Sequence, residues 1–123
     1  MRDVSWERVM DRANQDGEFR IAARLWSSTV RLDLGDRSVR LAIADGALRA
    51  ASPCDRDARC DVSVGGPADA WDALLAPVPP PLHQDLFGGV MAGRFLLAGD
   101  LELFYAYYPA VRRLLDLARQ ARR

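Results

Sequence analysis

Residues 95–119 read FLLAGDLELFYAYYPAVRRLLDLAR, and this stretch decides the fold that we expect. Its first four residues are apolar, which predicts a short strand covered on both faces, followed by a tight turn. Asp100 is a favourable N-cap, because its carboxylate can accept hydrogen bonds from the free amides of a first helical turn. A helix is therefore predicted over residues 101–119. A kink or restart is expected near Pro109, which lacks an amide and clashes with the preceding turn.

Apolar residues recur along this predicted helix at spacings of three and four, which makes one wide apolar face. They are Phe104, Tyr107, Tyr108, Val111, Leu114, Leu115 and Ala118. A helix of this length would be about 28 Å long and could cover a whole sheet. Two interpretations of the face stay open at this point. It is either part of the core only, or it also lines a cavity.

Composition restricts the classes of function. The 123 residues are half hydrophobic, which predicts one globular domain over residues 1–123. The formal net charge is zero, so nothing favours nucleic acid as a partner. The chain contains no lysine, which excludes a Schiff-base or P-loop lysine. No apolar stretch can span a bilayer and the N-terminal MRDVSWER is too charged for a signal peptide, so we expect a cytoplasmic protein without stable membrane insertion.

The rest of the chain divides into helices and strands by the period of its apolar residues. The predicted helices cover residues 4–14 and 18–25, a segment that begins at Pro67, and residues 83–90; the predicted strands cover residues 30–34, 39–44, 47–51 and 60–64. Asp45-Gly46 is a strong signal for a short hairpin. This order predicts an α+β domain with a five-stranded, mainly antiparallel sheet and helices on one face.

Few polar residues form a pattern typical of catalysis. The sequence lacks a Gly-x-Ser-x-Gly elbow and a glycine-rich phosphate loop. His83 and Asp85 form the one enzyme-like pair, with the imidazole as a base, although a surface histidine beside a helix-capping aspartate explains them as well. Cys54 and Cys60 are interpreted as free thiols. Two cysteines and one histidine cannot close a zinc site without carboxylates, so we expect no metal and no cofactor.

The segments that follow the predicted meander of strands are unusually bulky. They carry Trp71, Leu74, Leu75, Leu86, Phe87, Val90, Met91, Phe95, Leu97, Phe104 and Tyr108. These side chains exceed what a five-stranded sheet needs, which favours a cavity, but a core would use the same residues.

Several short motifs occur in a characteristic order. They are TVRLDL (29–34), VRLAIADG (39–46), CDVSV (60–64), Trp71 with Leu74-Leu75, and GRFLLAGD (93–100) before a leucine-rich helix that ends RRLLDLAR (112–119). This pattern resembles the sterol carrier protein 2 family over about residues 18–119. The Gly-Asp turn before the last helix is its most specific part. The chain looks like a small stand-alone bacterial member of that family.

The resemblance implies a five-stranded sheet covered by helices, with an apolar tunnel between them that holds a fatty acid, a fatty acyl-CoA or a sterol-like lipid. It further implies that the tunnel is lined by Trp71, Leu74, Leu75, Phe95, Leu97, Phe104 and Tyr108. We add Phe87 and Met91, which belong to the same bulky segments.

Three functions stay open on the sequence alone. The first is non-catalytic binding or transfer of a hydrophobic small molecule. The second is a small pathway enzyme acting on a polycyclic or acyl substrate, with His83 or Asp85 as the base. The third is an accessory domain that docks a partner enzyme through the arginine-rich end of the last helix. A homodimer is compatible with all three.

Overall fold

The computed structural model describes residues 4–122, which form a five-stranded sheet and six helices. The strands are β1 (Ser28–Leu34), β2 (Arg37–Ala44), β3 (Ala47–Cys54), β4 (Val62–Gly66) and β5 (Leu96–Gly99). They lie in the order β3-β2-β1-β4-β5, with β1 and β4 parallel and the other three pairs antiparallel. The predicted α+β class and mainly antiparallel sheet are confirmed.

Alternation of apolar residues determines which side of the sheet is buried. Val30 and Leu32 of β1 pair with Leu41 and Val39 of β2, and all four side chains are buried on the inner face. The hairpin from β2 to β3 turns at Asp45 and Gly46, with φ of 51° and 75°. Two consecutive positive φ angles match the twist of the flanking strands, as the Asp-Gly pair predicts.

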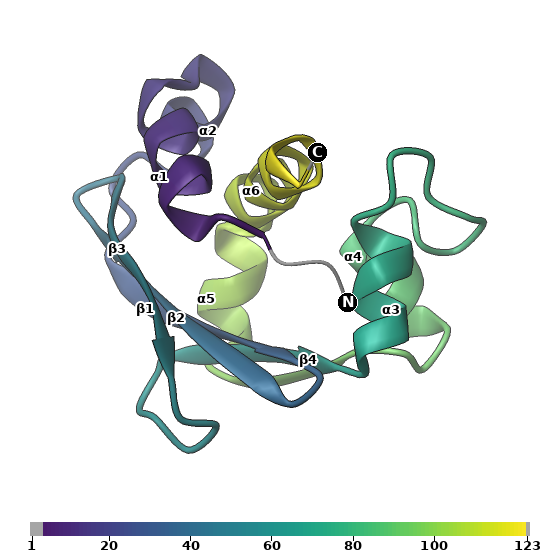
Figure 1. The fold of residues 1–123 in the computed structure, drawn as a ribbon. Coiled ribbons are helices and arrows are strands. Elements are labelled where there is room, and N and C mark those ends of the chain that lie inside the picture. The colour runs from purple at the N-terminus through teal and green to yellow at the C-terminus, as the bar shows by residue number, and fades with distance from the viewer. Residues whose placement is uncertain (1–3, 123) are drawn as a thin grey trace.

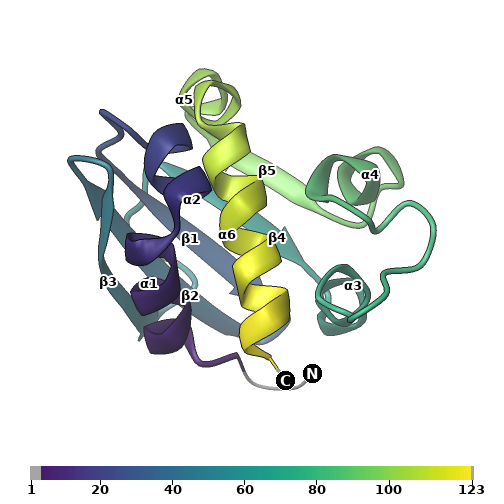
Figure 2. The ribbon, with the colours of Figure 1, turned by 90° about the horizontal axis from the view of Figure 1, so that it is seen from above.

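All six helices lie on the inner side of the sheet (Figure 1). They are α1 (Trp6–Gln15), α2 (Gly17–Ala22), α3 (Ala68–Leu74), α4 (Leu86–Met91), α5 (Leu101–Ala106) and α6 (Tyr108–Ala121). Seen from above, α1, α2 and α6 run side by side over the sheet, whereas α3 and α4 form a second group beside β4 and β5 (Figure 2). The prediction of helices on one face is therefore confirmed.

The predicted restart in the last helix is also confirmed. Asp100 caps α5 by accepting a hydrogen bond from the Leu103 amide at 3.0 Å. The helix ends at Ala106, and α6 begins at Tyr108 with Pro109 in its first turn, where the missing amide costs nothing. Figure 2 shows that α5 and α6 run in different directions, so of these two helices only α6 lies over the sheet.

Two strand predictions are wrong in part. The strand predicted over residues 95–98 was expected to be covered on both faces, but β5 is an edge strand and Leu96 is 73% exposed. An apolar run gives no information on how many neighbours a strand has. The strand predicted to end at Ala51 continues to Cys54 and contains Pro53. An edge strand tolerates proline, because one row of its amides needs no partner.

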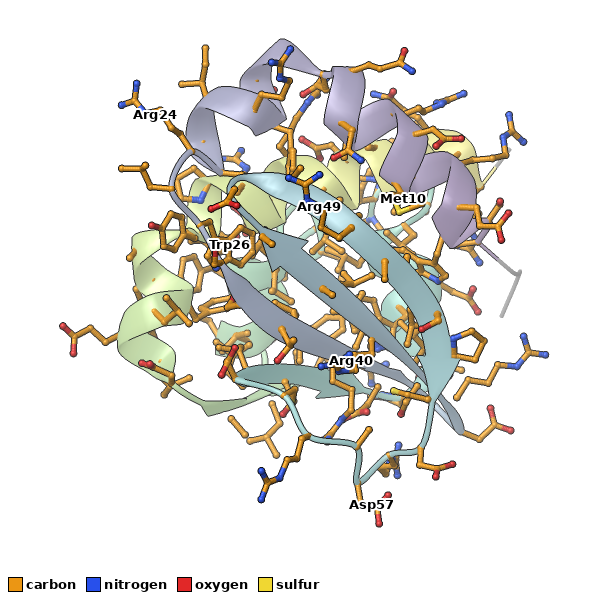
Figure 3. All side chains as sticks on the ribbon, turned by 90° about the vertical axis from the view of Figure 1, so that its left-hand side faces the viewer. Met10, Arg24, Trp26, Arg40, Arg49 and Asp57 are labelled. Atoms are coloured by element: carbon orange, nitrogen blue, oxygen red, sulfur yellow. The ribbon has the colours of Figure 1, made fainter. Side chains whose placement is uncertain are left out.

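The outer face of the sheet is polar and carries no helix. Its centre is Asp33, whose carboxylate accepts hydrogen bonds from Arg31 Nε at 2.9 Å, Arg31 Nη2 at 3.1 Å and Ser38 Oγ at 2.6 Å. Arg31 Nη1 also donates to the Ala58 carbonyl at 2.8 Å, which fastens the β3–β4 loop to this face. Figure 3 shows Arg40 on the sheet and Asp57 at the tip of that loop.

Candidate functional site

The two groups of helices meet at two places, and the first is an arginine brace at the C-terminal end of α6. Arg119 Nε and Nη2 donate to the Leu74 carbonyl at 3.1 and 2.7 Å. Arg122 pairs with the Asp72 carboxylate and also donates to its carbonyl. Both carbonyls lie near the C-terminal end of α3, where a helix presents negative charge. The brace fixes α3 against α6.

The second meeting place is an aromatic cluster formed by Phe87 of α4, Phe104 and Tyr105 of α5, and Tyr108 of α6. The ring centroids of Phe87 and Tyr108 are 4.0 Å apart, and those of Phe87 and Tyr105 are 5.7 Å apart. Phe104 meets Tyr108 at 5.7 Å. Each aromatic pair of this kind contributes about 0.5–1.5 kcal/mol of stability beyond the effect of the surface area that it buries. The cluster therefore joins α4 to the junction of α5 and α6.

Tyr108 connects the aromatic cluster with a groove on the surface. Its hydroxyl accepts a long hydrogen bond from the Phe87 amide at 3.4 Å. Burial raises the pKa of Tyr108 above its usual value, because the phenolate would lose solvation. The same residue lines a groove of about 340 Å³ between α2 and α6, together with Glu18 and Arg112. Tyr108 thus has one side in the cluster and one side at the surface.

The structure places the nine predicted ligand-binding residues in three environments. Trp71, Leu74, Leu75, Phe95 and Phe104 are buried, Phe87, Leu97 and Tyr108 are half-buried, and Met91 is 87% exposed. Trp71 and Phe95 meet edge to face at 5.0 Å, and the Trp71 indole donates to the Asp33 carbonyl at 2.8 Å. Among these nine residues, Trp71 and Phe95 are in ring contact, and Phe87, Phe104 and Tyr108 belong to the aromatic cluster.

Sequence reasoning missed a hollow of about 580 Å³ at the end of the sheet where β1 turns into β2. Its apolar lining comes from Val4, Trp6, Leu34, Val39 and Pro53, and its polar lining from Asp36, Arg37, Ser38, Cys54, Asp55 and Arg56. Leu34 and Val39 belong to the inner faces of their strands. The signal in the sequence was weak, because each of these residues reads as an ordinary strand end or helix start.

The polar candidates lie apart from these groups. Asp85 caps α4, because its carboxylate accepts from the Gly88 amide at 2.9 Å, so the capping role is confirmed. His83 Nδ1 lies 3.2 Å from the Pro81 carbonyl oxygen. Cys54 and Cys60 are free thiols, and burial raises the pKa of Cys54.

Residues 4–122 provide neither a metal-binding cluster nor a membrane span. No group of three or more His, Cys, Asp or Glu side chains is arranged to hold a metal ion there. Within the same range, no helix combines the length and apolarity required to cross a bilayer.

Comparison with known proteins identifies the fold. No protein-family model matches the chain, and no curated protein is significantly similar to it in sequence. A crystal structure of sterol carrier protein 2 superposes with a TM-score of 0.79 and 21% identity over 97% of each chain. This chain has the sterol carrier protein 2 fold. The likeness that the motifs implied for residues 18–119 thus extends over nearly the whole chain.

Two further structures share the sterol carrier protein 2 fold. One is a conserved hypothetical protein of Thermus thermophilus, described as possibly a sterol carrier protein, with a TM-score of 0.76 and 20% identity over 98% of this chain and 89% of that one. The other is UbiJ-SCP2, a ubiquinone synthesis protein, with a TM-score of 0.58 and 17% identity over 89% of this chain and 88% of that one.

Proposed function

We propose that this protein binds or transfers a hydrophobic small molecule without catalysing a reaction. The ligand would be a fatty acid, a fatty acyl-CoA or a sterol-like lipid, held in an apolar tunnel between the sheet and the helices. One observation carries the proposal: the likeness to sterol carrier protein 2 spans 97% of both chains.

The arrangement of the helices supports this location for the tunnel. The α1–α2–α6 group and the α3–α4 group meet at the arginine brace and the aromatic cluster, and a ligand between the two groups would lie over the apolar inner face of the sheet. Burying each methylene contributes about 0.8 kcal/mol, so a long acyl chain could gain on the order of 10 kcal/mol before the cost of ordering it. Binding an acyl chain in this way would not require a charged protein side chain inside the tunnel.

The proposed lining keeps the predicted residues, with different roles. Phe87, Leu97 and Tyr108 are half-buried and would be the first to contact an entering chain. The buried set around Trp71, together with Phe104, would form the deeper wall. Met91, which is exposed, would contact a ligand only at the mouth.

Native mass spectrometry of the purified protein tests the proposal, followed by extraction and identification of any released molecule. We expect a co-purifying lipid, or a saturable complex with a fluorescent fatty acid added to the lipid-free protein. Absence of both, with a range of fatty acid and sterol probes, would contradict the proposal.

A matched pair of variants locates the ligand. Phe87→Arg places a charge inside the aromatic cluster, and because Phe87 is half-buried the arginine head group can still reach water. Val78→Arg makes the same change at a loop residue that is 86% exposed. Fluorescence titration should show at least a tenfold weaker complex for Phe87→Arg and less than a twofold change for Val78→Arg. Equal affinities for Phe87→Arg and Val78→Arg would show that the aromatic cluster does not line the binding site.

Similarity to a ubiquinone synthesis protein favours one alternative, an accessory role in a biosynthetic pathway. The arginine-rich end of α6 is a weaker docking surface than the sequence implied. Arg113 pairs with Asp16 and Glu18, and Arg119 belongs to the brace. Arg112, which is exposed, is the better probe. Capture of a partner enzyme that is lost in Arg112→Glu would support the alternative.

A further inference from the structure

A second hollow, of about 590 Å³, lies on the opposite side of the sheet from the aromatic cluster, and we call it the outer hollow. Its lining includes Gly35, Arg56, Gly65, Gly66, Arg94 and Leu96. Asp33, Gly65 and Leu96 are neighbours across β1, β4 and β5, on the polar outer face. The volume falls within the range of small-molecule sites.

Topology explains why this part of the sheet is open. β1 and β4 are adjacent and parallel, and both end here. The chain leaves β1 toward β2 on one side and leaves β4 toward β5 on the other side. The Gly35 amide donates to the Gly66 carbonyl at 3.0 Å where the two paths separate. The two paths therefore leave the carboxyl ends of β1 and β4 in different directions, and no strand or helix of residues 4–122 covers the sheet between them.

Glycine keeps the floor of the outer hollow free of side chains. A Cβ atom on Gly65 would lie 3.4 Å from Asp33 Cβ, which is a normal contact, so a side chain could be accommodated by the strand but would fill the hollow. A Cβ atom on Gly66 would lie 2.8 Å from the Arg94 carbonyl oxygen, so that position requires glycine for packing. Gly65 is therefore the residue whose lack of a side chain leaves space for a ligand.

Two arginines from distant segments line the outer hollow. Arg56 donates one hydrogen bond to the Gly35 carbonyl. Arg94 Nη2 pairs with Asp69 at 2.5 Å, while Arg94 Nε is buried and has no hydrogen-bond partner within residues 4–122. A guanidinium has five N–H donors, so each arginine retains donors for an anion.

Two acidic residues, Asp33 and Asp69, contact the outer hollow or its arginines, whereas Asp36 and Asp55 line the neighbouring hollow that Arg56 also borders. Asp33 also lines the hollow, but its carboxylate is matched by two hydrogen bonds from Arg31 and one from Ser38. The Asp69 side chain is 72% exposed, and solvent weakens such surface ion pairs, so an anion can displace Asp69 from Arg94.

We propose that the outer hollow binds an organic phosphate. The phosphate or pyrophosphate oxygens accept hydrogen bonds from Arg56 and Arg94, and the body of the molecule lies over Gly65 against Leu96. Planar guanidinium groups match phosphate oxygens in a bidentate geometry. The hollow is wide and open to solvent, so a group larger than a lone ion can enter it. The outer hollow opens on the face of the sheet away from the proposed lipid tunnel and shares only Phe95 with its predicted lining, so either proposal can fail without the other.

Isothermal titration calorimetry with the full chain tests the proposal, using ADP and inorganic pyrophosphate as probes and adenosine as the uncharged control. We expect saturable binding of ADP and pyrophosphate at low ionic strength and a much weaker response to adenosine. Arg56→Ala and Arg94→Ala should each weaken ADP binding about tenfold. Asp69→Asn should strengthen it at least twofold, because Arg94 loses its competing partner.

Two further variants separate a specific site from general charge attraction. Arg49→Ala removes a positive charge on β3, at the other edge of the sheet (Figure 3), and should change affinity less than twofold. Gly65→Val fills the floor without changing charge and should abolish binding while circular dichroism stays native. Equal losses for Arg49→Ala and Arg56→Ala, or unchanged affinity in Gly65→Val, would overturn the proposal.

The phosphate could come from a soluble molecule or from a lipid head group, and vesicles distinguish the two. Phosphatidylcholine vesicles containing phosphatidic acid should co-sediment with the protein only if a head group can enter the outer hollow. Co-sedimentation that is lost in Arg94→Ala assigns the site to a lipid phosphate, whereas ADP binding alone assigns it to a soluble one. If the protein binds none of ADP, pyrophosphate and the vesicles, the proposed site is wrong.

Discussion

Asp33 is the residue that connects the side-chain hydrogen bonds on the polar outer face of the sheet. It is almost fully buried on the outer face, and its carboxylate holds Arg31 and Ser38. Asp33→Ala would leave a partly buried guanidinium without its charge partner. We expect a loss of about 2–3 kcal/mol in the free energy of unfolding, measured by urea denaturation.

The matched control for Asp33 is Asp69→Ala, which removes an exposed carboxylate from Arg94. It should leave the free energy of unfolding nearly unchanged, because solvent screens the ion pair. Similar losses for the two variants would show that the Asp33 network contributes no more than a surface contact.

Asp16 determines part of the stability in acid. Hydrogen bonds from Arg113, aided by the Phe19 amide, lower its pKa from 3.8 to about 2. Because the folded-state pKa is depressed, the ion pair contributes fully above about pH 4, and this contribution is lost as the pH falls through about 2. Asp16→Asn retains a capping side chain for α2 but loses the charge.

Denaturation at several pH values checks the role of Asp16. Between pH 5 and pH 2, the free energy of unfolding of the wild type should fall by about 1–2 kcal/mol more than that of Asp16→Asn. This energy is already reduced to allow for the partial solvent exposure of the ion pair. At pH 5 the variant should be less stable by a similar amount. Parallel curves for the two proteins would show that folding does not lower the pKa of Asp16.

At the scale of single elements, Gly99 shows how β5 joins the sheet. Its φ is 98°, and a Cβ atom there would lie 2.2 Å from the Asp61 carbonyl oxygen. Gly99→Ala should therefore lower the free energy of unfolding by about 2–4 kcal/mol, because it adds backbone strain and a clash. Gly17→Ala is the control, because nothing lies within 4 Å of the added atom at the start of α2, and it should be neutral or slightly stabilising. Thermal unfolding would distinguish the two variants.

The elements that the sequence predicted well are those whose signal is local. The positive φ angles at Asp45 and Gly46, the Asp100 cap and the helix restart at Pro109 all follow from one or two residues. The exposure of β5 could not be predicted, because Leu96 and Leu97 have the same character in the sequence. Their burial depends on which neighbours the sheet provides.

The burial of two predicted site residues could also be read from local signals in the sequence. Trp71 and Phe104 are large and apolar at regular spacing, and both are buried in contact with other predicted residues. Met91 belongs to the six-residue α4, which is too short to have a well-defined apolar face. The outer hollow was missed because Arg56 and Arg94 are brought together only by the sheet topology.

At the scale of the whole molecule, the sheet separates two surfaces of different chemistry. Two groups of helices cover the inner face (Figure 1), which is apolar. The outer face is polar and bears the outer hollow. A ligand on the inner face would contact elements from both groups of helices. Its effect should therefore appear in the stability of the entire domain rather than in one element.

Thermal unfolding is the measurement that detects such a ligand. A ligand that binds only the folded state raises the free energy of unfolding by about 2.7 kcal/mol at a concentration 100 times its Kd. For a domain of this size we expect saturating oleate to raise Tm by roughly 10 °C. Val78→Arg should retain the increase, and Phe87→Arg should lose most of it. If oleate raised Tm equally in Phe87→Arg, the ligand would stabilise the protein from outside the aromatic cluster, and the tunnel proposed between the two helix groups would be wrong.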